Sequence, residues 1–158
     1  MTISLHQARI GDVAAIMRVM DSAFDPAFGE AWTPAQLLTL FAVPSSRLCL
    51  ARSGDGIRGF SAARVAGAES ELLLLAVDPA ASGQGVGRLL VADWRQWAAE
   101  QGASDLFLEM RADNPALGLY NSCGFSECGR RPAYYRGADG IVRDAITMRL
   151  YSNEPGNI

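Results

Sequence analysis

The chain has 158 residues, of which 49% are apolar and 20% charged, a balance typical of a globular protein long enough to bury a substantial core. Its net charge of −3 argues against a nucleic-acid-binding module and is compatible with a cationic substrate such as an amine or a basic peptide. No apolar run approaches the ~20 residues that span a bilayer, no signal-peptide pattern opens the chain, and three cysteines without C-x-x-C spacing favour a reduced, cytoplasmic protein.

The first part of the chain predicts a strand, two helices and a loop that carries aromatic residues. A short strand is expected at residues 3–8, and an apolar stripe at helical spacing predicts a helix directly after it. The loop that follows holds Phe28 and Trp32, and apolar loop side chains either fill the core or line a pocket. Thr33 and Gln36 then form a capping-box pattern that starts a second, short helix.

Three strands are expected in succession after this helix, at residues 47–52, 57–65 and 71–78. Short turns join them, which predicts an antiparallel meander. The run from Leu72 to Val77 is apolar without alternation, and this is typical of a strand that is covered on both faces. Pro79 ends that strand because proline has no N–H to donate.

Glycines at alternate positions join the buried strand to a helix expected from about Val86. These glycines are Gly83, Gly85 and Gly87. The first N–H groups of a helix lack internal partners, and glycines let an anion approach them closely. Arg88 could add a side-chain charge to such a site. The segment is therefore either a phosphate-binding loop or a plain tight turn, since glycine spacing alone does not separate the two.

Residues 105–111 predict a strand that is interrupted by a carboxylate. Alternate residues from Leu106 to Met110 form one apolar face, whereas Glu109 shares the other face with Phe107. Either that face reaches solvent at Glu109, or the carboxylate has a chemical role.

One further helix and two strands complete the expected fold. The helix is expected to start at Asp113 or Asn114 and to stop at Gly124. The chain is extended from Cys128 onward, and alternation over residues 144–150 predicts the final strand.

The order of these elements, together with several motifs, resembles the GNAT acyl-CoA N-acyltransferase superfamily. The motifs are Leu75-Ala-Val-Asp78, Leu108-Glu-Met-Arg111, Asp113-Asn114, Leu119-Tyr120 and Cys123-Gly-Phe125. The resemblance covers residues 2–150 and implies an α/β fold with a mixed central sheet of about seven strands. The implied order is strand, two helices, three strands, helix, strand, helix and two strands, with a splay between the strands at 71–78 and 105–111. The aromatic loop and the run Arg130-Arg131-Pro-Ala-Tyr134-Tyr135 are similar to bacterial enzymes that acetylate the N-terminal alanine of a ribosomal protein.

The resemblance also implies acetyl-CoA as the cosubstrate. Ser82 stands where the family usually has Gln or Arg, so the pyrophosphate contacts are expected mainly from backbone amides. The interval from Asn114 to Tyr120 is one residue shorter than the family usually has. The implied acetyl-CoA contacts are Leu75, Ala76, Val77, Ser82, Gly83, Gln84, Gly85, Val86, Gly87, Arg88, Asn114 and Tyr120.

The same resemblance places Glu109 as the general base and Tyr120 as the general acid for the departing thiolate. A positioned base is needed because an amine must lose a proton to attack a thioester. No metal is expected, because His6 is the single histidine of the chain, and Cys123 is expected to be structural because no covalent enzyme intermediate is required. The implied substrate contacts are Phe28, Trp32, Glu109, Tyr134 and Tyr135.

Three functions remain open at this point. The first is acetylation of a protein N-terminus, with a ribosomal protein beginning with alanine as the implied partner. The second is acetylation of a small-molecule amine, and the third is a non-catalytic acyl-CoA-binding regulatory module. Glu109 and Tyr120 favour an enzyme, and the aromatic residues favour a peptide groove. We expect a single domain over residues 1–151, a polar tail over 152–158, and neither a nucleic acid nor a membrane as partner.

Overall fold

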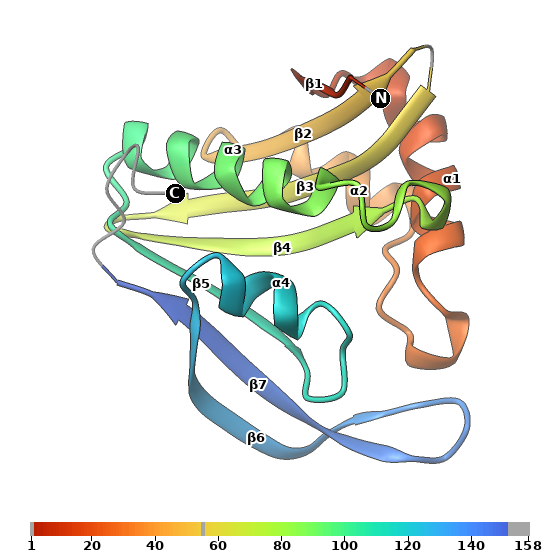
Figure 1. Ribbon diagram of the computed structural model, residues 1–158, viewed down its shortest axis with the longest axis vertical. Coiled ribbons are helices and arrows are strands. Elements are labelled where there is room, and N and C mark those ends of the chain that lie inside the picture. Colours follow the sequence, from red (N-terminus) through yellow and green to blue (C-terminus); the bar gives the residue numbers. More distant parts are fainter. Residues whose placement is uncertain (1, 55, 152–158) are drawn as a thin grey trace.

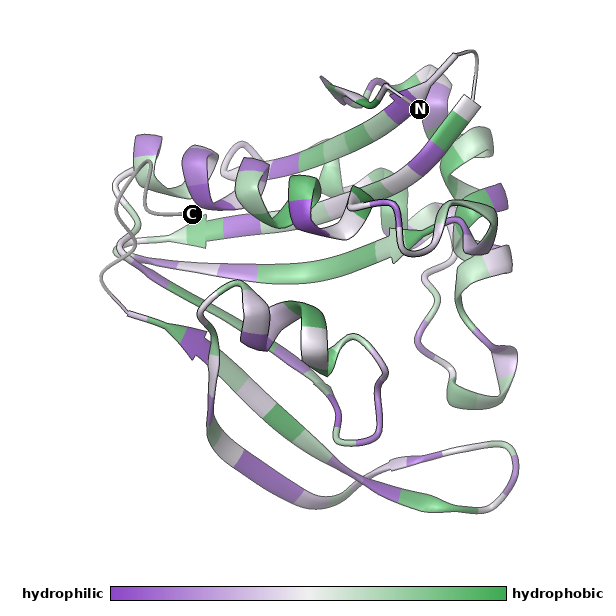
Figure 2. Cartoon of the chain, viewed as in Figure 1, coloured by the Kyte–Doolittle hydropathy of each residue, from purple (hydrophilic) through white to green (hydrophobic). Residues whose placement is uncertain are grey.

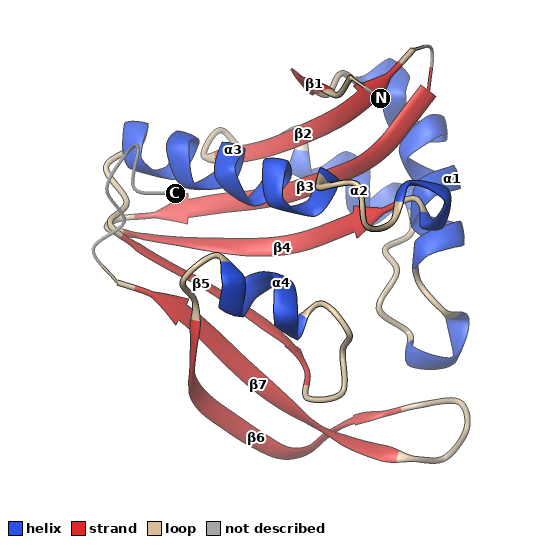
Figure 3. Ribbon diagram, in the orientation of Figure 1, coloured by secondary structure: helices blue, strands red, loops and turns tan. Residues whose placement is uncertain are grey.

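The computed structural model describes residues 2–54 and 56–151 and shows a sheet with helices on both faces (Figures 1 and 3). The strands are β1 (Ser4–Gln7), β2 (Ser46–Ser53), β3 (Gly56–Ala66), β4 (Glu69–Val77), β5 (Asp105–Arg111), β6 (Ser126–Arg136) and β7 (Val142–Leu150). The helices are α1 (Val13–Ala23), α2 (Pro34–Leu40), α3 (Val86–Glu100) and α4 (Leu117–Ser122). Residue 55, between β2 and β3, and the expected tail at 152–158 lie outside the described residues.

The seven strands form one mixed sheet in the order β1-β2-β3-β4-β5-β7-β6. The β4–β5 pair is parallel, and the other neighbouring pairs are antiparallel. The predicted fold class and order of elements are therefore confirmed, including the meander that leads into the buried strand.

Local signals account for where several helices begin and end. The predicted capping box is present, because Thr33 Oγ1 accepts the Gln36 N–H at 3.2 Å and Gln36 Oε1 accepts the Thr33 N–H at 2.8 Å. The predicted stop after α4 is confirmed, since Gly124 has a φ of +93°, which glycine adopts without steric cost.

The start of α4 differs from the prediction. The helix begins at Leu117 rather than at Asp113 or Asn114. Instead of capping a helix, Asn114 makes a local turn in which its Oδ1 accepts the Ala116 N–H at 2.9 Å. Asn114 therefore lies in a turn that precedes the helix.

β4 contains a bulge and then separates from β5. Leu72 and Leu74 pair with successive residues of β3, so Leu73 is the extra residue of a β-bulge. The parallel ladder between β4 and β5 covers only residues 69–71 and 105–107. Beyond it the two strands diverge (Figure 1), which confirms the expected splay.

Separate apolar clusters hold helices on the two faces of the sheet. Hydrophobic residues run along the second half of β4, between these layers (Figure 2). Helices α1 and α2 pack through Ile16, Val19, Met20, Leu37, Leu40, Leu50, Phe60 and Leu74. Helices α3 and α4 pack on the other face through Leu72, Val91, Trp94, Leu106, Leu108, Tyr120, Phe125 and Met148. Strand β4 thus contributes to both layers, as its continuous apolar run predicts.

We expect Gly59→Ala to destabilise the packing of α3 on the sheet. A Cβ at Gly59 would lie 2.8 Å from the Ala76 carbonyl oxygen and 3.0 Å from Val86 Cγ1. Overpacking of this kind should lower the free energy of unfolding by about 1–3 kcal/mol, measured by urea denaturation. Gly118→Ala is the control, because a Cβ there would meet no atom within 4 Å and alanine favours the helix. Equal unfolding free energies for the two variants would contradict the close approach of α3.

Candidate active site

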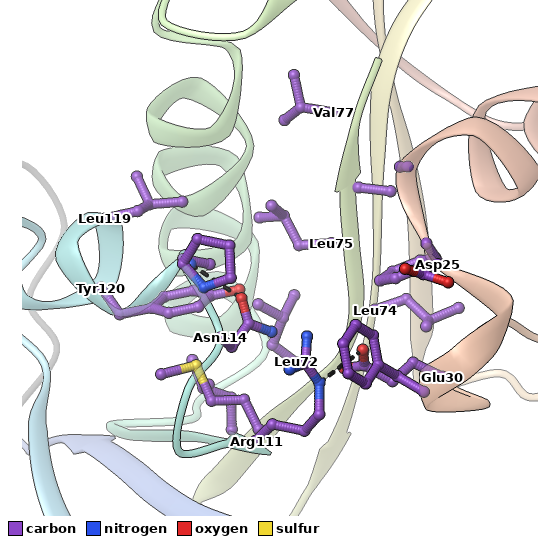
Figure 4. Close-up of a pocket in the computed structure, with 18 of the residues that line it drawn as sticks. Asp25, Glu30, Leu72, Leu74, Leu75, Val77, Arg111, Asn114, Leu119 and Tyr120 are labelled. Carbon is purple, nitrogen blue, oxygen red and sulfur yellow. Dashed lines mark hydrogen bonds and ion pairs between the residues drawn. The ribbon is translucent and has the colours of Figure 1, made fainter. Parts of the chain in front are cut away.

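A pocket of about 740 Å³ opens where β4 and β5 separate (Figure 4). It lies beside α4 on one side and the loop between α1 and α2 on the other. Its lining is Ala23, Phe24, Asp25, Phe28, Glu30, Leu72, Leu74, Leu75, Ala76, Val77, Pro79, Ser82, Leu108, Glu109, Met110, Arg111, Asn114, Pro115, Ala116, Leu119 and Tyr120.

The end of β4 supplies the middle of this pocket. Leu75 and Val77 point toward α4, and Leu74 points toward the loop that carries Asp25 and Glu30 (Figure 4). Past the short ladder, β5 no longer pairs with β4, so backbone N–H groups on that edge are available to an oxygen in the pocket. Donors arranged in this way can stabilise the charge that develops on a carbonyl oxygen during acyl transfer.

The glycine loop joins the pocket to the start of α3. Ser82 lines the pocket, while Gly83 and Gly85 follow with φ values of +76° and +82°. A Cβ on either glycine would meet no atom within 4 Å, so the loop presents its backbone to open space. Because Gly85 occupies the N-cap and no side chain caps the helix, the first N–H groups of α3 are available to an anion.

The residues around the loop have different surroundings. Gln84 is exposed, and the Arg88 side chain donates to Ser122 Oγ at 2.8 Å. Gly87 is buried against α4, where a Cβ would lie 2.9 Å from Leu119 Cδ2. The glycine at 87 therefore permits helix packing, whereas those at 83 and 85 shape the loop.

Tyr120 and Asn114 form the wall on the α4 side (Figure 4). Tyr120 is 6% exposed, and its ring packs edge-on against Phe125 with centroids 6.1 Å apart. Burial, with a smaller contribution from Cys123, raises the pKa of the Tyr120 hydroxyl above its usual value. The hydroxyl is therefore protonated at neutral pH, as a proton donor must be.

Glu109 lies in the same pocket, on β5. Its side chain is 24% exposed and forms an ion pair in which Arg131 Nε lies 3.3 Å from Glu109 Oε2. Burial, followed by the charges of Glu109 and Glu30, raises the pKa of Tyr135. Tyr134 is exposed and packs edge-on against Tyr135 with ring centroids 5.1 Å apart.

The two aromatic residues of the α1–α2 loop have different positions. Phe28 lines the pocket, whereas Trp32 packs against the apolar cluster of α1 and α2. The sequence left open whether these aromatic residues fill the core or line a pocket. Phe28 lines the pocket, and Trp32 packs against the core.

The structure brings some of the predicted site residues together and leaves others outside. Those that line the pocket are Phe28, Leu75, Ala76, Val77, Ser82, Glu109, Asn114 and Tyr120. The glycine loop and the start of α3 follow Ser82 directly. Trp32, Tyr134 and Tyr135 are not part of the lining.

Charged residues that the sequence analysis did not select also lie in the pocket. Arg111 has a side chain only 7% exposed, and its Nε lies 3.0 Å from Glu30 Oε1 (Figure 4). Asp25 lies nearby and accepts the Ala27 N–H at 2.9 Å through Oδ1. A charge at the end of an apolar strand and an acid between loop aromatics were signals that could have identified Arg111 and Glu30.

Two negative findings apply to residues 2–54 and 56–151. No helix in that part of the chain is both long and apolar enough to cross a membrane. Nor are three or more His, Cys, Asp or Glu side chains grouped there in a way that could hold a metal ion.

Comparison with known proteins gives consistent matches. Residues 44–127 match the acetyltransferase (GNAT) domain. The chain is 36% identical over 131 residues to N-alpha-acetyltransferase RimI of Mycobacterium tuberculosis, covering 80% of this chain and 79% of that protein. It is 42% identical over 83 residues to the [ribosomal protein bS18]-alanine N-acetyltransferase of Escherichia coli, covering 52% of this chain and 55% of that protein.

A solved structure extends the match to nearly the whole chain. The ribosomal-protein-S18-alanine N-acetyltransferase from Escherichia coli superimposes with a TM-score of 0.86 at 28% identity, covering 99% of this chain and 97% of that one. The resemblance drawn from the sequence motifs is thereby confirmed. The chain belongs to the GNAT acetyltransferase family and is an acetyl-CoA-dependent N-acetyltransferase.

Proposed function

We propose that this enzyme acetylates the N-terminal α-amine of a protein, and that its acceptor is a ribosomal protein beginning with alanine. The observation that carries the proposal is the shared pocket of Glu109, Tyr120 and the open end of β4. Relatives named as bS18-alanine N-acetyltransferases support the choice of acceptor. We assign the activity to a single domain over residues 1–151, acting in the cytoplasm, where free thiols such as Cys49, Cys123 and Cys128 stay reduced.

Acetyl-CoA is proposed to bind between the glycine loop and β4. Its pyrophosphate would lie at the amides of residues 83–88, with Ser82 and Asn114 at the inner end. The open space beside Gly83 and Gly85 fits this group, since no atom lies within 4 Å of either Cβ position. The thioester would then reach Leu75–Val77, whose amides can bind its carbonyl oxygen.

In the proposed reaction, Glu109 removes a proton from the acceptor ammonium, directly or through a water molecule. The neutral amine attacks the thioester carbon, the carbon–sulfur bond breaks, and Tyr120 protonates the thiolate of CoA. The nitrogen loses its second proton as the amide forms, and this proton restores the Tyr120 hydroxyl through water. A protein α-amine has a pKa of ~8 and a lysine side chain a pKa of ~10.4, so a single carboxylate base is better matched to an N-terminus.

Acceptor binding is assigned to the aromatic and acidic side of the pocket. Phe28 lines it directly. Tyr134 and Tyr135 are assigned to its surroundings, where they would flank an extended peptide, whereas Trp32 packs against the apolar cluster of α1 and α2. The carboxylates of Asp25, Glu30 and Glu109 outnumber the guanidinium of Arg111 in the lining, and this excess of negative charge would favour a cationic acceptor.

We expect Gly85→Asp to weaken acetyl-CoA binding strongly, because it places a negative charge where the pyrophosphate is proposed to lie. Gly85→Asn is the matched control, since asparagine has a similar shape and also tolerates a positive φ. Calorimetry should show a much larger loss of affinity for the aspartate variant while both variants remain folded. Equal affinities for the two variants would reject the loop as the pyrophosphate site.

We expect Tyr120→Phe to lower kcat by on the order of 10²-fold, because the thiolate then leaves without a positioned proton donor. The affinity for acetyl-CoA should change little, since the ring and its contact with Phe125 are retained. Steady-state kinetics at neutral pH and calorimetry measure the two quantities. A kcat within about twofold of the unmodified enzyme would leave the hydroxyl with a structural role only.

We expect Glu109→Gln to lose activity on an N-terminal peptide, most severely below pH 7. The variant depends on amine that is already neutral, and this fraction falls tenfold for each pH unit below the amine pKa of ~8. Glu127→Gln is the control, because Glu127 pairs with Arg130 at 3.2 Å on the exposed strand β6. Equal losses for both variants would remove Glu109 from the mechanism.

The choice of acceptor has its own test, in which CoA release is measured with three kinds of amine. A peptide beginning Ala-Arg should be the best acceptor, ahead of an N-terminally blocked peptide that contains lysine and ahead of a panel of small amines. Preference for the lysine peptide would reject the N-terminal assignment. Activity on small amines alone would assign the enzyme to the small-molecule branch.

A further inference from the structure

We propose that Arg111 is a positioning residue for the acceptor, because it fixes the Phe28 and Glu30 side of the pocket to the end of β5. This inference rests on the proposed function in that it takes this side of the pocket as the acceptor site. The role concerns the shape of the acceptor site and assigns Arg111 no part in proton transfer.

Arg111 is buried and contacts Glu30, Asp113 and Phe28, and we call this group of contacts the clamp. Its Nε lies 3.0 Å from Glu30 Oε1, and Nη1 lies 2.6 Å from Asp113 Oδ1. The guanidinium carbon lies 3.7 Å from the centroid of the Phe28 ring. Burial of a guanidinium is costly unless it is paired, and here two carboxylates and an aromatic face take up its charge. The α1–α2 loop is thus tied to β5 by a residue 81 positions away from Glu30 in the sequence.

A second arginine extends the clamp to the turn between β6 and β7. The Arg143 guanidinium carbon lies 4.7 Å from the Phe28 centroid, and Arg143 Nε lies 2.9 Å from Asp113 Oδ2. Arg143 Nη2 also lies 2.8 Å from Asp139 Oδ2, and this hydrogen bond lowers the pKa of Asp139. Phe28 therefore lies under two guanidinium groups that share Asp113 as a partner.

The backbone joins the same two segments. The Ala138 N–H donates to the Ala27 carbonyl oxygen at 2.7 Å, which links the β6–β7 turn to the α1–α2 loop. Gly137 is buried at this contact, and a Cβ there would lie 2.5 Å from Asp139 Oδ1 and 3.2 Å from the Ala27 oxygen. The turn and the loop approach each other at the open end of the sheet (Figure 1).

A similar group of an arginine, a glutamate and a phenylalanine lies at the other end of β5, outside the pocket. It serves as a control that has the same residue types in a different place. Arg149 Nη1 lies 3.3 Å from Glu69 Oε1, and its guanidinium carbon lies 4.8 Å from the Phe107 centroid. None of these three residues lines the pocket, whereas Arg111, Glu30 and Phe28 all do. Loss of Arg111 should therefore affect acceptor binding, and loss of Arg149 should not.

The test compares Arg111→Gln with Arg149→Gln, using whichever acceptor the unmodified enzyme acetylates best. In Arg111→Gln the acceptor KM should rise about tenfold or more, while the Kd of acetyl-CoA stays within about twofold. Arg149→Gln should leave both quantities within about twofold. Arg111→Lys should fall between, because lysine keeps the charge but neither stacks on Phe28 nor pairs through a planar fork. An equal loss of acetyl-CoA affinity and acceptor binding in Arg111→Gln would overturn the proposal.

A second measurement needs no acceptor and so separates this proposal from the proposed function. Amide hydrogen exchange over residues 24–32 should quicken in Arg111→Gln and in Phe28→Leu, but not in Arg149→Gln. Gly137→Ala should quicken the same segment, because its Cβ would crowd Asp139, Arg143 and the Ala27 oxygen without changing a charge. Unchanged exchange over residues 24–32 in Arg111→Gln would overturn the clamp. Faster exchange with no rise in acceptor KM would overturn its role in acceptor positioning.

Discussion

The separation of β4 from β5 is the constraint on which the rest of the structure depends. A parallel ladder that stops early leaves backbone groups unpaired, and such groups cost free energy unless another partner takes them. Here the bulge at Leu73 and the end of pairing at Glu71 direct that edge of β4 into the pocket. The strands can separate because apolar clusters on both faces of the sheet hold helices against β4, and one of these clusters also includes Leu106 and Leu108 of β5.

Different parts of the pocket lining carry groups of different charge preference. On the α3 side, the helix N-terminus and the glycine loop offer N–H groups to an anion. Elsewhere in the lining, the carboxylates of Asp25, Glu30 and Glu109 outnumber the guanidinium of Arg111, which holds Glu30 in place. Tyr120 is buried in the wall on the α4 side, where its raised pKa keeps its hydroxyl protonated. In the proposed function, the polyanionic cosubstrate would bind at the helix N-terminus and the amine among these carboxylates.

Most of the fold could be predicted from the sequence because its signals are local. The capping box at Thr33 and Gln36, the apolar run that ends at Val77 and the glycine stop at Gly124 each act within a few residues. The break in apolar pattern at Glu109 likewise marked a residue that the structure places in the pocket. The prediction of where α4 begins was wrong, because a side-chain turn at Asn114 competes locally with helix formation.

The sequence by itself thus determined the elements, their order and the family, because periodicity, caps and motifs are properties of neighbouring residues. Tertiary structure alone decided which loop aromatic reaches the pocket, so that Phe28 lines it and Trp32 packs, partly buried, against the core. It also decided that Arg111 pairs with Glu30 and that Leu73 forms a bulge. These features depend on which surfaces meet after the helices have packed. A contact such as that of Arg111 with Glu30, 81 positions apart, produces no periodic pattern in the sequence.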